Sequence, residues 1–90
     1  MAYRLAPLPK TAAKFIRAQT EKQRQAIYDA LRKICETPLR DMNIKRLKGR
    51  RRGQFRYRLG DIRIIYTVDA EKETVTIVAI GQRGRIYKAP

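Results

Sequence analysis

The sequence predicts an α+β domain in which two helices pack on one face of an antiparallel β-sheet. Three observations support this class: a short segment bounded by prolines near the start, two consecutive stretches with apolar residues at helical spacing, and a second half built from β-rich runs separated by turns. The predicted order is βααβββ, an N-terminal edge strand and a helical hairpin followed by a three-stranded antiparallel meander. A chain of 90 residues predicts one domain spanning positions 1–90.

The first element, Ala2 to Leu8, alternates in part and is closed by Pro7 and Pro9. Proline has no N–H to donate to a neighbouring strand, so we expect an edge strand here. The stretch from Lys10 to Gln19 then predicts a helix, because three of its apolar residues share one face. Those residues are Ala12, Phe15 and Ile16.

A second helix is predicted after Thr20, which forms a capping box with Gln23: the hydroxyl accepts from a free backbone N–H, and the glutamine reaches back. Pro38 ends this helix, because the residue before a proline disfavours the helical conformation. Its buried stripe follows the i, i+3, i+4, i+7 spacing and consists of Ile27, Ala30, Leu31 and Ile34. We therefore expect a helical hairpin that covers one face of the sheet and leaves the other face uncovered.

The clearest β-hairpin joins residues 55–59 to residues 62–68 through the two-residue turn Gly60-Asp61. This turn fixes the register, so Arg58 should lie directly opposite Arg63. One side of the hairpin is predicted to be core, with Phe55, Tyr57, Leu59, Ile62, Ile64, Tyr66 and Val68. The other side carries Arg56, Arg58 and Arg63. Like charges directly opposite each other cost on the order of a few tenths of a kcal/mol, which indicates a surface that holds a polyanion.

The remaining segments connect these elements. Leu39 to Ile44 is predicted to be a linker, and Lys45 to Gly53 a basic loop. Asp69 to Lys72 supplies a second turn. Thr74 to Ile80 (TVTIVAI) is β-branched and almost continuously apolar, which predicts a central strand.

Charge limits the class of partner. Twenty-two Lys and Arg against eight Asp and Glu give a net charge of +14, which favours nucleic acid, an acidic protein or an anionic membrane surface as the partner. No apolar run approaches the ~18 residues of a spanning helix, and no signal-peptide core is present, so the membrane interpretation is weak. With a lone cysteine, Cys35, a cytoplasmic protein without disulfides is expected.

Several chemistries are excluded by residue type. The chain has no histidine, so it cannot form a Ser-His-Asp or Cys-His triad or a His-ligated metal site. Cys35 falls on the apolar side of the second predicted helix and is expected to be a buried structural thiol. The acidic residues are scattered along the chain, so we expect no metal site and no cofactor.

The order of the elements and three segments resemble the RelE/ParE superfamily of toxins from type II toxin–antitoxin modules. The segments are LKG (47–49), YRLGDIRIIY (57–66) and IGQRGRIYK (80–88), and the resemblance spans essentially the whole chain. It is closer to the RelE branch, which implies a toxin that binds the ribosomal A site, cleaves mRNA without a metal and is held inactive by an acidic, RelB-like antitoxin in a hetero-oligomer. The alternatives are a ParE-like inhibitor of DNA gyrase without RNase activity, and a catalytically weak nucleic-acid-binding member of the same fold.

The resemblance also implies a catalytic set: Arg56, Arg58, Arg63, Arg83 and Tyr87. RNA can be cut by its own 2′-hydroxyl, and without histidine the acceleration must come mostly from positioning and charge stabilisation. We expect Arg58 and Arg63 on the phosphate oxygens and Arg83 on the leaving-group side.

Arginine stands where RelE proteins often carry lysine, and it is a good phosphate clamp but a poor general base. The proton acceptor stays open between Tyr87, Lys48 and solvent, and packing at the chain end is the alternative role for Tyr87. A predicted contact with ribosomal RNA comprises Lys45, Arg46, Lys48, Arg50, Arg51 and Arg52. The alternative for this segment is a solvated charged loop.

Overall fold

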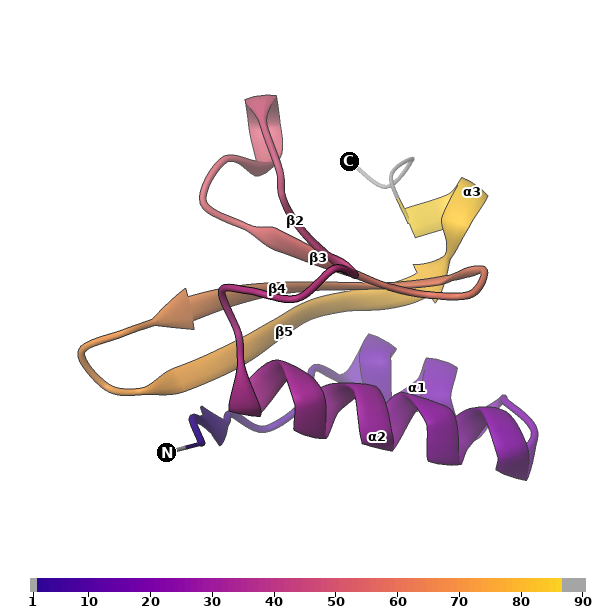
Figure 1. Cartoon of the computed structure of the whole chain (residues 1–90). Helices are drawn as coiled ribbons and strands as arrows, with labels where there is room; N and C mark the ends of the chain where they lie inside the picture. Colours follow the sequence, from indigo (N-terminus) through magenta and orange to yellow (C-terminus); the bar gives the residue numbers. More distant parts are fainter. Residues whose placement is uncertain (1, 87–90) are drawn as a thin grey trace.

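The computed structural model describes residues 2–86, which form a five-stranded sheet with helices on one face (Figure 1). The strand order is β1-β5-β4-β3-β2, with β1 parallel to β5 and every other neighbouring pair antiparallel. In chain order the elements are β1 (Arg4–Leu5), α1 (Lys10–Arg17), α2 (Glu21–Glu36), β2 (Ile44–Arg46), the 3₁₀ turn η1 (Gly49–Arg51), β3 (Phe55–Leu59), β4 (Ile62–Asp69), β5 (Thr74–Gln82) and α3 (Arg83–Ile86). The predicted class is confirmed, with the N-terminal strand at an edge of the sheet.

The helices α1 and α2 pack on the same face of the sheet (Figure 1). Thr20 caps α2, because its Oγ1 accepts a hydrogen bond from the backbone N–H of Gln23 at 3.2 Å. Cys35 is free and buried, and burial raises the pKa of its thiol, which is the environment of a structural cysteine. The residues of α1 and α2 that enter the core are Ala12, Ile16, Ile27, Ala30, Leu31, Ile34 and Cys35, and Phe15 of the first predicted stripe packs against them.

The β3–β4 hairpin has the predicted register in all its pairs, including Arg58 opposite Arg63 and Leu59 opposite Ile62. Gly60 has φ +57°, and Asp61 has a negative φ, which is the pattern of a type II′ turn with glycine first. Every side chain expected on the core side of this hairpin lies in the core or packs against it. The turn therefore determines which residues face away from the helices.

The β4–β5 pair contains one irregularity. Ile65 pairs with Ala79 and Tyr66 pairs with Ile77, so Val78 is an extra residue on β5 without a partner. This bulge shifts the alternation, so that Ile77 and Ile80, three positions apart, both enter the core on the helical side. It explains why the predicted strand is almost continuously apolar.

The segment before β3 differs from its prediction as a linker and loop. Ile44–Arg46 forms β2, an edge strand antiparallel to β3, with Ile44 opposite Tyr57. The reason is local: Ile44 packs against the core, and the backbone N–H of Arg58 donates to the carbonyl of Asn43 at 2.9 Å. Lys45 and Arg46 therefore belong to the sheet, and the loop itself is shorter than expected.

We expected the sheet face opposite α1 and α2 to be uncovered, but it is partly covered. Figure 1 shows η1 and α3 on that side. Ile86 of α3 packs over Gly81 of β5, where a Cβ would lie 3.6 Å from Cβ of Ile86, an ordinary van der Waals contact. Arg51 Nη2 also donates to the carbonyl of Ile86 at 3.3 Å, and Ile65 on this face is fully buried.

A buried tyrosine provides a test of the core. The hydroxyl of Tyr66 donates to the carbonyl of Pro38 at 2.7 Å, and burial raises the pKa of this phenol above its usual range, so it stays protonated at neutral pH. Tyr66→Phe should lower the free energy of unfolding by about 1–3 kcal/mol, because the carbonyl loses its donor. Urea denaturation measures this change. Tyr28→Phe, at a side chain that is 46% exposed, is the control and should shift it by less than about 0.5 kcal/mol.

Candidate functional site: a basic sheet face

We call the side of the sheet opposite α1 and α2 the basic face. Residues directly opposite each other across strands share a face, so the pairings define two rows of side chains on it. One row consists of Arg58, Arg63 and Gly81, and the other of Lys45, Arg56, Ile65 and Ala79. The predicted strand arginines are therefore on one face, together with a lysine that we had assigned to a loop.

Arg58 is the exposed cation of the first row. Its strand is held on both sides, by β4 and by the carbonyl of Asn43, which accepts from the backbone N–H of Arg58. The guanidinium is thus carried by a rigid interior strand and is open to solvent. That combination suits a phosphate contact.

Arg63 lies opposite Arg58 but is only 7% exposed, which differs from the open position we expected. Its Nη1 donates to the carbonyl of Gly60 at 2.6 Å and to that of Ile62 at 3.1 Å. The side chain therefore turns back onto the β3–β4 turn and donates to its carbonyls. Its geometry is that of a support for the turn.

Arg83 begins α3, directly after β5, and its side chain is exposed. Its backbone N–H donates to the carbonyl of Asp61 at 2.8 Å, which ties the start of α3 to the β3–β4 turn. This bond places Arg83 at the same end of the sheet as Arg58 and Arg63, as predicted from the sequence. Tyr87, the remaining member of the predicted set, lies outside the described residues.

Arg56 belongs to the second row and is partly buried. Its Nε is fully buried and has no hydrogen-bond partner among residues 2–86. On one side it is paired with Lys45 and on the other with Ile65, which is fully buried. Arg56 is therefore set more deeply than Arg58, between a charged edge strand and an apolar interior one.

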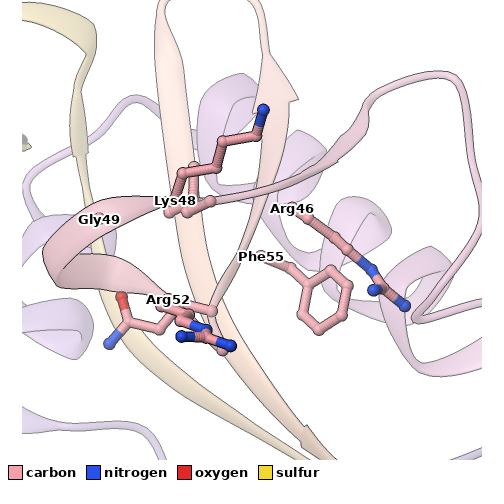
Figure 2. A pocket seen from close by; sticks show the side chains of 8 residues that line it. Arg46, Lys48, Gly49, Arg52 and Phe55 are labelled. Carbon is pink, nitrogen blue, oxygen red and sulfur yellow. The ribbon is translucent and has the colours of Figure 1, made fainter.

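The loop between β2 and β3 encloses a hollow of about 560 Å³ (Figure 2). Phe55 is at its base, with its ring stacked on Tyr66 at 5.5 Å between centroids, and Cζ of Arg46 lies 5.7 Å from the centre of the Phe55 ring. The residues that line the hollow are Arg46, Leu47, Lys48, Gly49, Arg52, Gly53, Gln54 and Phe55. The predicted RNA-contacting loop is thus an ordered arch with an aromatic base, which sequence spacing alone did not reveal.

The ion pair found within the described residues lies away from the basic face. Within residues 2–86, an ion pair joins Arg32 to Asp29 on α2, with 3.2 Å between Nη1 and Oδ1, on the helical side of the molecule. The same residues contain no cluster of His, Cys, Asp or Glu that could hold a metal ion. In this part of the chain no helix has the length and apolar character needed to cross a membrane.

The fold and the basic face define a small α+β protein suited to polyanion binding, and comparisons with known proteins identify its family. The family model described as ParE toxin of type II toxin–antitoxin system, parDE, matches residues 10–87. The chain belongs to this family and is a toxin of the type II toxin–antitoxin class. No curated protein sequence matches the chain.

Similar solved structures agree with this assignment. The Mycobacterium tuberculosis RelBE2 toxin–antitoxin complex contains a chain that is 26% identical, with a TM-score of 0.79, covering 92% of this chain and 100% of its own. A double arginine-to-alanine mutant of Escherichia coli RelE is 25% identical, with a TM-score of 0.75 and coverage of 97% and 90%. A YoeB/ParE toxin from Agrobacterium tumefaciens, 18% identical over 88% of this chain and 96% of its own, shares the fold with a TM-score of 0.74.

The two arginines that face each other should differ when mutated. Arg63→Ala should lower the free energy of unfolding by about 1–3 kcal/mol, because buried carbonyls lose a charged donor. Arg58→Ala, at an exposed side chain, should change it by less than about 0.5 kcal/mol. Chemical denaturation of both variants measures the difference, and equal small effects would contradict a supporting role for Arg63.

Proposed function

We propose that the protein is a ribosome-dependent, metal-independent mRNA endoribonuclease that stops translation. The observation that carries this proposal is the placement of two exposed arginines, Arg58 and Arg83, at one end of the basic face. In this reaction the 2′-hydroxyl attacks the adjacent phosphate, and the products are a 2′,3′-cyclic phosphate and a free 5′-hydroxyl. The protein must hold the reacting groups in line and stabilise charge on the phosphate oxygens.

For the four predicted catalytic arginines, the surroundings support a role in this reaction. Arg58 contacts the non-bridging phosphate oxygens, and Arg83 stabilises charge on the leaving 5′-oxygen. Arg56, whose Nε has no partner in the described part of the chain, adds positive charge from below the substrate. Arg63 positions the other two through its bonds to the β3–β4 turn. Tyr87 remains a proposed contact to a base or a proton carrier, on the grounds of sequence alone.

The ribosome would supply the scaffold that so small a protein lacks. We propose that the arch between β2 and β3 contacts ribosomal RNA, because its cations are mostly exposed and are carried on an ordered loop. Contacts of this kind give affinity and salt dependence with little sequence information. An mRNA held in the ribosome is then presented to the basic face.

An acidic antitoxin is the proposed protein partner. Several similar structures are toxin–antitoxin complexes, among them RelBE2 from Mycobacterium tuberculosis. A chain with a net charge of +14 attracts a negatively charged partner over the range of the Debye length. Such a partner, laid on the basic face, would cover Arg58 and Arg83 and block RNA.

A gyrase inhibitor without RNase activity is the second candidate function, favoured by the match to the ParE family model. The two candidates differ in target, because a gyrase inhibitor leaves mRNA intact and traps gyrase on DNA. A catalytically weak nucleic-acid-binding protein would do neither. One preparation of toxin can be tested with translating ribosomes and with gyrase, and the class of damage separates these functions.

Removing either exposed arginine should stop cleavage. Arg58→Ala and Arg83→Ala should each reduce the cleavage rate by about 100-fold or more, because the transition state then lacks one charge-stabilising group. Primer extension on mRNA from an in vitro translation reaction measures the cut. Arg17→Ala, at an exposed position of α1, is the matched control and should cleave normally. Full translation arrest by both variants would contradict the catalytic assignment.

The arch should control affinity without altering where mRNA is cut. Replacing Arg50 and Arg52 by Gln should weaken ribosome binding and reduce the slope of log affinity against log salt by about 1–2, roughly one unit for each phosphate that no longer meets a cation. Sedimentation with ribosomes over a range of salt concentrations measures the slope. Replacing Lys22 and Lys33 by Gln, both exposed on α2, removes the same charge from the other side and should change the slope much less. Equal slopes for both double variants would contradict a contact through the arch.

A further inference from the structure

We propose that Lys45 is the group that accepts the proton of the attacking 2′-hydroxyl. This inference rests on the proposed RNA cleavage and names a residue that the reaction still lacks. Arginine cannot serve, because a guanidinium does not lose its proton in proteins. The remaining cations of the basic face, Arg56, Arg58 and Arg63, are all of this type.

The position of Lys45 follows from its neighbours in β2. Ile44 packs against the core, and Cζ of Arg46 lies 5.7 Å from the centre of the Phe55 ring, which is itself a core residue. Side chains alternate along a strand, so Lys45 between them points to the opposite side, the basic face. There it is paired directly with Arg56, and it is exposed.

The tyrosines of residues 2–86 lie elsewhere. Tyr57 and Tyr66 are in the core on the helical side, and the hydroxyl of Tyr66 donates to the carbonyl of Pro38. Tyr28 is on α2 and Tyr3 packs against the core. Lys48 lies beyond the end of β2, directly before η1, and so is not carried by the sheet. Lys45 is thus the amine that the sheet itself presents there.

The arrangement across the sheet fits an in-line displacement. Lys45 is on β2, Arg58 is on the adjacent strand β3, and Arg83 follows β5 on the far side of β4. A phosphate on Arg58 would therefore have the amine on one flank and Arg83 on the other. In-line attack requires the entering and leaving oxygens to lie on opposite sides of phosphorus. Neighbouring strands are about 4.8 Å apart, and β3 is one spacing from β2 and two spacings from β5. Long side chains from both flanks can therefore approach one phosphate held by Arg58.

The step balances with groups already named. Lys45 first releases a proton to solvent, and its amine then takes the proton of the 2′-hydroxyl and becomes an ammonium ion again. The 2′-oxygen forms a bond to phosphorus while the bond from phosphorus to the 5′-oxygen breaks. The leaving 5′-oxygen takes a proton from water. The charges around Lys45 come from Arg46 on its own strand and from Arg56 and Arg58 on β3.

Substitution by arginine separates proton transfer from charge. Lys45→Arg keeps the charge, so it should bind ribosomes within about 3-fold of the wild type, yet cleave mRNA about 100-fold more slowly or worse. Lys45→Ala should be as slow as Lys45→Arg in cleavage, and ethylamine in the buffer should restore part of its rate. Lys33→Arg and Lys33→Ala, at an exposed position of α2 on the other side of the molecule, are the matched controls: both should cleave mRNA at the wild-type rate, and ethylamine should not change that rate. The measurements are single-turnover cleavage of ribosome-bound mRNA and sedimentation with ribosomes.

Two results would overturn the role of Lys45: Lys45→Arg cleaving within about 3-fold of the wild type, or ethylamine failing to raise the rate of Lys45→Ala. The first would mean that a positive charge is all this position supplies. Neither result would contradict the proposed cleavage of mRNA by the wild-type protein. Absence of cleavage by the wild-type protein would instead contradict the proposed function, so the two failures are distinguishable.

Discussion

The two-residue turn between β3 and β4 is the constraint on which the rest of the structure depends. With Gly60 at positive φ the strands can pair in one register, and a shift by one residue would exchange the two faces of the hairpin. The turn also connects Arg63 and the start of α3 at this end of the sheet. Its carbonyls accept from Arg63 Nη1 and from the backbone N–H of Arg83, so the side-chain support and the last helix are both attached to it.

The basic face, which α1 and α2 do not cover, carries apolar side chains as well as cations. The row of Ile65 and Ala79 is apolar, and a sheet cannot leave such a row in water without cost. Ile86 of α3 packs over Gly81, and Arg51 connects the arch to the end of α3. The basic face is therefore built as a partly covered surface, with an apolar strip beside its cations. On this face Arg63 is buried, while Arg58 opposite it is exposed.

Much of this could be predicted from the sequence, where periodicity and turn chemistry act locally. The helical stripes, the cap at Thr20 and the whole β3–β4 register follow from residue spacing. What could not be predicted depends on contacts between distant segments. Strand β2 needs β3 as its partner, and three residues with two cations carry no strand signal of their own. Similarly, the contact between Arg51 and Ile86 joins residues 35 positions apart, and the bulge at Val78 is visible only in the pairing of β4 with β5. The placement of Lys45 on the basic face depended on the first of these.

Strand β2 also has an outer edge that pairs with no other strand in the described chain, and free strand edges invite pairing with another molecule. Here the edge is short and carries Lys45 and Arg46. If two copies met edge to edge, the cations of both edges would be brought within a few ångströms of one another. The charges that we propose to contact RNA would thus also oppose self-association as an extended sheet, so the same side chains would serve both purposes.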